Sequence, residues 1–173
     1  MFTLILPGNS KNNEQYAKDL EFEFQGHNLN PITILYNHWQ TGEELIDYDF
    51  ELTKLYEILS KRQNESYKVF AKSAGIILFL KFLESYHTIE HPTLSVFAGI
   101  PLRFAEAIEY PLVCQLQSLT SRVIILQKTL DPQIGFTALK EKLPESDILK
   151  LINIPGNNHN YSDLNSISYL LQP

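Results

Sequence analysis

The stretch VFAKSAGIIL, from Val69 to Leu78, changes character in its middle. An apolar run gives way to Ala71-Lys72-Ser73-Ala74-Gly75, and a second apolar run begins at once. The pattern predicts a buried strand, a tight turn and a buried helix. A serine in such a turn can cap the helix, or it can be held on a strained backbone with its hydroxyl exposed. The rest of the chain bears on this choice.

Short apolar runs recur along the whole chain, with helical segments between them. The six runs span residues 2–6, 32–36, 67–71, 94–98, 122–126 and 149–154. Their continuous hydrophobicity indicates strands buried on both faces, as in a parallel sheet covered by helices. An intervening segment has Leu52, Leu55 and Leu59 at helical spacing. The sequence therefore predicts an α/β fold whose functional residues lie in the loops after the six strands.

Length, charge and cysteine content limit the class of protein. A chain of 173 residues is expected to form one domain over residues 1–173. The net charge of −6 and the scattered Lys and Arg residues argue against a nucleic-acid partner. The single cysteine, Cys114, excludes a disulfide within the chain, and the N-terminal run stopped by Pro7 does not have the pattern of a signal peptide. Without an apolar stretch near the roughly 20 residues of a membrane span, we expect a cytoplasmic protein.

Three polar residues follow three different predicted strands in the order Ser73, Asp131, His159. Parallel strands bring these loops to one edge of the sheet, where an imidazole can lie between a hydroxyl and a carboxylate. In that arrangement the histidine removes the serine proton, while the aspartate fixes the tautomer and stabilises the imidazolium. The order and position of the three residues favour nucleophilic catalysis over a helix-capping role for the serine.

With these motifs the chain resembles the α/β-hydrolase fold serine hydrolases, especially their small single-domain members. The resemblance is carried by AKSAG at 71–75, TLDPQIG at 129–135, GNNHNY at 156–161 and LILPGN at 4–9. Ala71 replaces the usual first glycine of the turn, and the chain begins at what would be the family's third strand. The resemblance implies a minimal three-layer sandwich without a cap domain. Its mainly parallel six-stranded sheet would have the spatial order second, first, third, fourth, fifth, sixth.

The resemblance also implies an activity and its residues. Ser73 would be the nucleophile, His159 the base and Asp131 the acid of a catalytic triad, with an oxyanion hole formed by the backbone amides of Asn9 and Ala74. The expected reaction is hydrolysis of an ester or thioester of a small-molecule acyl substrate through an acyl-serine intermediate, without a metal or an organic cofactor. A peptidase or amidase would use the same residues. The alternative from another class is a binding or scaffold protein with an inactive triad.

Other residues near these loops have two interpretations each. Trp39 follows the second strand and either lines a substrate pocket or anchors its loop. Lys72 either attracts an acidic group of the substrate or is solvated or ion-paired. Asp163 is a second candidate acid, although it follows His159 in the chain. Cys114 is expected to be buried in a helix, and the four other histidines, which form no metal-binding pair, are expected at the surface.

Overall fold

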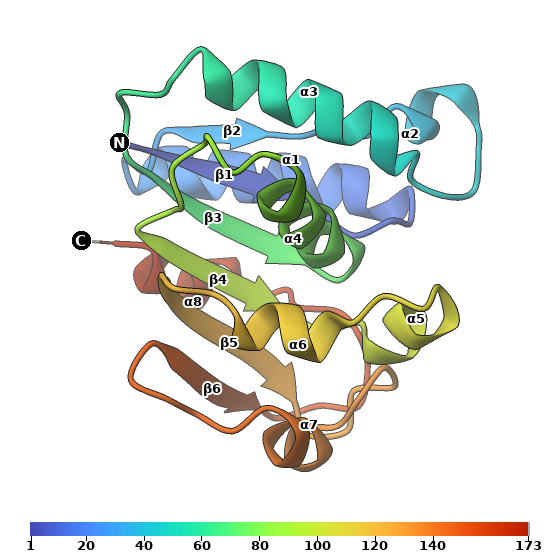
Figure 1. Cartoon of the computed structure of the whole chain (residues 1–173). Coiled ribbons are helices and arrows are strands. Elements are labelled where there is room, and N and C mark those ends of the chain that lie inside the picture. Colours follow the sequence, from blue (N-terminus) through green and yellow to red (C-terminus); the bar gives the residue numbers. More distant parts are fainter. Residues whose placement is uncertain (173) are drawn as a thin grey trace.

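The computed structural model describes residues 1–172 and contains one parallel sheet (Figure 1). The six strands are β1 (Phe2–Leu6), β2 (Pro31–Thr33), β3 (Tyr67–Lys72), β4 (Leu94–Ala98), β5 (Arg122–Lys128) and β6 (Leu149–Ile154). Their spatial order is β2-β1-β3-β4-β5-β6. The predicted fold class and strand order are confirmed. Every strand pair is parallel, so the carboxyl ends of all strands lie at one edge.

The edge strand β2 is shorter than its apolar run. The run predicts a strand over 32–36, whereas the strand ends at Thr33. Beyond it the chain leaves the sheet, and Tyr36 packs in the core, where its hydroxyl donates a 2.6 Å hydrogen bond to the carbonyl of Pro7. The side chain of Tyr36 thus ties the loop after β2 to the loop after β1.

Helices cover both faces of the sheet (Figure 1). They are α1 (Asn12–Gly26), α2 (His38–Thr41), α3 (Tyr48–Ser60), α4 (Ala74–Ser85), α5 (Leu102–Ala107), α6 (Leu112–Gln117), α7 (Phe136–Lys142) and α8 (Leu164–Leu170). Helices α1 and α8 pack on one face, and α3 to α7 contribute to the core on the other. The segment between β4 and β5 carries two short helices, where its length predicts about one. No helix within residues 1–172 has the length and hydropathy to cross a membrane.

Side chains of the central strand β3 alternate between these two faces. Val69 and Ala71 belong to the core under α3 and α4, whereas Phe70 packs in the core under α1 and α8. Lys68 and Lys72 share the face of Phe70, and both are buried. Two lysines therefore lie on one buried face of one strand, at its opposite ends.

Two expectations about exposure are wrong. Cys114 is exposed, because α6 buries Leu112 and Leu116 and a residue two positions from each lies on the other side of the helix. His38 is buried at 3% exposure, because its ring stacks on Tyr36 at a centroid distance of 5.7 Å. Neither position can be inferred from the sequence around it, since each depends on how a short helix packs.

Candidate active site

Ser73 occupies a strained turn between β3 and α4. Its backbone has φ 52° and ψ −122°, a left-handed conformation that residues other than glycine rarely adopt. Holding a serine in it costs about 1–3 kcal/mol. The turn is held by hydrogen bonds from Ser73 N–H to Ala98 O and from Ile76 N–H to Ser73 O. A Cβ at position 75 would overlap the carbonyl oxygens that end β1, so only glycine fits there. The Ser73 side chain makes no capping hydrogen bond to α4, which argues against the capping interpretation.

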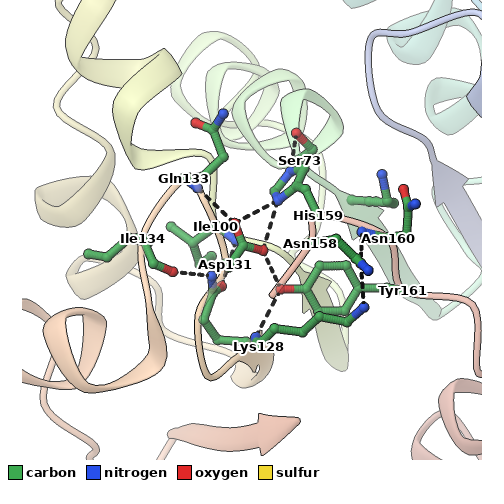
Figure 2. Close-up of polar contacts among 12 residues, drawn as sticks. Ser73, Ile100, Lys128, Asp131, Gln133, Ile134, Asn158, His159, Asn160 and Tyr161 are labelled. Atoms are coloured by element: carbon green, nitrogen blue, oxygen red, sulfur yellow. Dashed lines mark hydrogen bonds and ion pairs between the residues drawn. The ribbon is translucent and has the colours of Figure 1, made fainter. Parts of the chain in front are cut away.

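The three residues singled out from the loops lie in one hydrogen-bonded chain (Figure 2). Ser73 Oγ lies 2.9 Å from His159 Nε2. On the other side of the ring, His159 Nδ1 lies 2.9 and 2.8 Å from the two carboxylate oxygens of Asp131. The bond to the carboxylate places a proton on Nδ1, which leaves the Nε2 lone pair directed at the serine hydroxyl. The geometry suits proton transfer from Ser73.

The Asp131 carboxylate receives two further hydrogen bonds. Gln133 N–H donates to Oδ1 at 2.8 Å, and the hydroxyl of Tyr161 donates to Oδ2 at 2.7 Å. Burial acts to raise the pKa of Asp131, but the hydrogen bonds from His159, Gln133 and Tyr161 outweigh it and hold that pKa below its ordinary value. The carboxylate is therefore ionised at neutral pH and can stabilise a positive charge on the imidazole.

Tyr161 was missed in the sequence, although it lies two residues after His159 in GNNHNY. Its hydroxyl also accepts a hydrogen bond from Lys128 N–H at 3.1 Å, and its ring meets the His159 ring edge to face at 6.0 Å. Burial raises the pKa of Tyr161 well above its ordinary value, and the hydrogen bond to Asp131 raises it further. The hydroxyl thus remains a donor to the carboxylate. No sequence signal distinguishes this tyrosine from the other eight.

Two residues at the ends of β4 and β5 position the neighbouring loops. Gly99 has φ 68°, and a Cβ there would lie 2.7 Å from His159 Cε1. Glycine at this position therefore allows the histidine loop, residues 156–161, to cross the end of β4. Gln127 is fully buried and accepts a 2.8 Å hydrogen bond from Ile100 N–H. Its amide group donates to the carbonyl of Ile134 at 2.6 Å. The loops after β4 and β5 are therefore held in place around Asp131.

Asn9 is held by four hydrogen bonds, two at its side chain and two at its backbone carbonyl. Its side chain accepts from Ile46 N–H and donates to Glu44 O, both at 2.8 Å. Its backbone carbonyl accepts from His38 Nε2 and Trp39 Nε1, again both at 2.8 Å. Trp39, a candidate pocket residue, instead lies in the core at 3% exposure, outside the cavity beside the serine. Its place supports the anchoring interpretation.

The backbone N–H groups of Asn9 and Ala74 have no hydrogen-bond partner within residues 1–172. Asn9 and Ser73 line the same cavity, and Ala74 is the first residue of α4 directly after Ser73. Unpaired N–H groups at a helix N-terminus carry partial positive charge. The arrangement can supply two donors to a developing oxyanion beside the serine hydroxyl.

A cavity of about 580 Å³ opens beside Ser73, and Lys72 lines it. Lys72 is 5% exposed, and its ammonium donates to Asn13 Oδ1 at 3.0 Å and lies 5.7 Å from the centre of the Tyr16 ring. Burial lowers the pKa of Lys72 to about 8, an effect that the charge of Asp131 partly opposes. Lys72 is thus buried, and within residues 1–172 no carboxylate pairs with it, contrary to the alternative weighed from the sequence.

The remaining candidates lie elsewhere. Asp163 caps α8, accepting a 3.1 Å hydrogen bond from Ser166 N–H, and takes no part in the hydrogen-bonded chain at His159. In the part of the chain that the structure describes, no group of three or more His, Cys, Asp or Glu side chains is arranged to hold a metal ion.

No protein-family model matches the sequence, and no curated protein matches it either. Solved structures do match. A monoacylglycerol lipase from Paleococcus ferrophilus is 12% identical with a TM-score of 0.69, over 98% of this chain and 93% of that one. The RedJ thioesterase of Streptomyces coelicolor is 11% identical with a TM-score of 0.65, over 98% and 84%.

The esterase Pf2001 of Pyrococcus furiosus is 13% identical with a TM-score of 0.67, over 98% of this chain and 79% of that one. At such low identity the similarity concerns the course of the backbone rather than the chemistry of a site. It extends over nearly all of this chain and includes the all-parallel sheet that carries Ser73 at a strand end. The chain has the fold of the α/β hydrolases.

Proposed function

We propose that the protein is a serine hydrolase that cleaves an ester or thioester bond through an acyl intermediate on Ser73. The observation that carries the proposal is the hydrogen-bonded chain Ser73, His159, Asp131, with the serine held on a strained turn and free of any capping bond. Solved structures of this fold include proteins named lipase, thioesterase and esterase, which is consistent with acyl transfer.

In the first step, Ser73 Oγ attacks the carbonyl carbon of the substrate while His159 Nε2 takes the hydroxyl proton. The carbonyl electrons move to the oxygen, and the N–H groups of Ala74 and Asn9 stabilise its negative charge. Asp131 stabilises the imidazolium that forms. When the tetrahedral intermediate collapses, the bond to the leaving alkoxide or thiolate breaks, and His159 protonates that group.

In the second step, water hydrolyses the acyl-serine. His159 Nε2 takes a proton from the water as its oxygen attacks the acyl carbon, and the same two N–H groups stabilise the second oxyanion. Collapse breaks the bond to Ser73 Oγ, which regains its proton from His159. A carboxylic acid leaves, and the enzyme returns to its starting state. Each proton taken by His159 is given back within the same step.

The experiment that tests this proposal is covalent labelling with a fluorophosphonate, followed by identification of the modified residue by mass spectrometry. A serine hydroxyl is almost inert near neutral pH unless a positioned base accepts its proton. Labelling should therefore occur at Ser73, vanish in Ser73→Ala and fall by orders of magnitude in His159→Ala. In Asp131→Asn, labelling should weaken while the fold is kept, because the amide favours the wrong imidazole tautomer.

Turnover separates the proposal from a binding or scaffold role. An active enzyme hydrolyses an activated ester such as 4-nitrophenyl acetate repeatedly, whereas an inactive triad gives no turnover. Labelling at another residue, or labelling that persists in Ser73→Ala, would overturn the assignment of the nucleophile. A panel of esters, thioesters and amides then distinguishes an esterase from a peptidase or amidase, which would use the same residues.

A further inference from the structure

The cavity beside Ser73 differs from a site built for an apolar acyl chain. Among the lining residues that the structure describes there is no Leu, Ile, Val, Met or Phe, and there is no carboxylate. Asparagine and serine side chains provide much of its wall, with Tyr16 and Tyr161 as the aromatic residues. The single lysine of the wall is Lys72. The cavity is thus lined mainly by Asn, Ser and Tyr residues and contains one lysine.

The ammonium group of Lys72 has few partners inside the protein. Asn13 Oδ1 is its one hydrogen-bond acceptor among residues 1–172, and the ring of Tyr16 faces it at 5.7 Å. An ammonium group has three donors, so two are left uncommitted. Asp131 contributes a favourable charge from a distance and Lys128 an unfavourable one. A buried ammonium without a paired carboxylate is costly, and an anion entering the cavity would remove that cost.

Lys68 is a second buried lysine in the same strand, and its surroundings differ from those of Lys72. It lies on the same face of β3, is 6% exposed, and donates a 2.6 Å hydrogen bond to the carbonyl of Leu171 at the C-terminal end of α8. A cation is favourable at a helix C-terminus. Lys72 instead faces Asn13 in the first turn of α1, where a cation is electrostatically unfavourable. The charge of a helix C-terminus therefore explains why the ammonium of Lys68 can be buried. No such helix charge explains the burial of Lys72.

We propose that Lys72 is the anion-binding group of the substrate site, so that the preferred substrate is an acyl ester or thioester carrying a negatively charged group such as a carboxylate. This inference rests on the proposed hydrolase function. Lys72 and Ser73 are adjacent in the chain, with Cα atoms about 3.8 Å apart, and both line the one cavity. One small molecule in this cavity can therefore place an anion on the ammonium of Lys72 and a carbonyl at Ser73 Oγ.

The test compares matched esters that differ in charge. For a charge on the acyl part, the pair is mono-4-nitrophenyl glutarate and 4-nitrophenyl butyrate. For a charge on the alcohol part, it is 3-(butyryloxy)benzoate and its methyl ester. The measured quantity is the ratio of kcat/KM for the charged ester to that for the neutral ester. We expect wild-type protein to prefer the charged member of at least one pair, and the pair that shows it identifies the side of the substrate that meets Lys72.

Lys72→Gln removes the charge and keeps a donor for Asn13 Oδ1. The charged-to-neutral ratio should fall about 10- to 100-fold, the usual contribution of a hydrogen bond to a charged group. Lys72→Arg, which keeps the charge, should retain part of the preference. The matched control is Lys68→Gln, which removes a lysine of equal burial from the far end of the same face, about 13 Å away along the strand. Its ratio should equal that of wild-type.

The outcomes separate the two proposals. Wild-type protein that hydrolyses neutral esters at least as well as charged ones in both pairs overturns the anion site and leaves the hydrolase proposal intact. The same holds if the ratio is unchanged in Lys72→Gln. If Lys72→Gln does not fold, the wild-type ratio and that of Lys72→Arg still decide the question. Wild-type protein that hydrolyses none of the four esters and resists fluorophosphonate labelling overturns the hydrolase proposal itself.

Discussion

Replacing Tyr161 by phenylalanine tests how the acid of the candidate triad is held. The change keeps the buried ring and removes the hydroxyl, which donates to Asp131 Oδ2 at 2.7 Å and accepts from Lys128 N–H at 3.1 Å. A hydrogen bond to a charged group contributes about 1.5–3 kcal/mol. Tyr161 is only 3% exposed, so the lost bond to the carboxylate is not readily replaced by water. We expect the free energy of unfolding to fall by about 2–3 kcal/mol at pH 7.

The pH dependence of this loss identifies its cause. The folded-state pKa of Asp131 lies below its ordinary value, so the bonds to its ionised form stabilise the fold above the unfolded-state pKa. That stabilisation is lost as the pH falls through the folded-state pKa. Without the Tyr161 hydroxyl the pKa of Asp131 rises, and the variant loses its remaining stabilisation at a higher pH than wild-type. The difference between the two proteins should therefore be largest at neutral pH and shrink as the pH falls through their folded-state pKa values.

The assay is urea denaturation followed by circular dichroism at a series of pH values, with fluorophosphonate labelling rates measured on the same samples at pH 7. Labelling should slow about tenfold, because the carboxylate that orients His159 is less firmly held. Tyr169→Phe is the matched control, since that tyrosine is exposed at 59%. A stability difference that does not shrink as acid protonates Asp131, or one below about 0.5 kcal/mol at pH 7, would refute the role given to the hydroxyl.

Further substitutions test the turn, the cavity and the loop after β1. Gly75→Ala should destabilise the fold by about 3 kcal/mol or more, because the new Cβ would overlap two backbone oxygens; a change below 1 kcal/mol in urea denaturation would contradict this. Ser73→Gly should be about 1 kcal/mol more stable than Ser73→Ala, since only glycine adopts φ 52° without strain; the reverse order would contradict the strained turn. The preference for charged esters should decline as the pH rises through about 8, where Lys72 loses its proton; a ratio that is constant from pH 6.5 to 9.5 would contradict this. Trp39→Phe removes a donor to the Asn9 carbonyl and should lower kcat about tenfold with little change in KM; an unchanged kcat would show that the loop is positioned without it.

The sequence alone predicted the sheet and the three residues that meet at its edge. In a run such as 94–98 apolar side chains occupy both even and odd positions, which a strand requires only when both of its faces are buried. Parallel strands have their carboxyl ends at one edge, so the loops after β3, β5 and β6 lie at the same edge of the sheet. Ser73, Asp131 and His159 could be placed at this edge for that reason, whereas their contact requires the loop after β6 to cross the end of β4.

The tertiary structure decided which side chains surround these three and what each one contacts. Tyr161 and Gln127 act through hydrogen bonds to Asp131 and Ile100, about 30 residues away in the chain, and no local pattern distinguishes them from other tyrosines and glutamines. Trp39 is buried against the loop after β1 rather than exposed in a pocket, since the chain leaves the sheet after Thr33. Lys72 is an unpaired cation only because α1 and the histidine loop enclose it without bringing a carboxylate. Hydrophobic periodicity follows from local sequence, and the strand order was implied by the resemblance, whereas burial and charge pairing depend on contacts between segments that the sequence keeps apart.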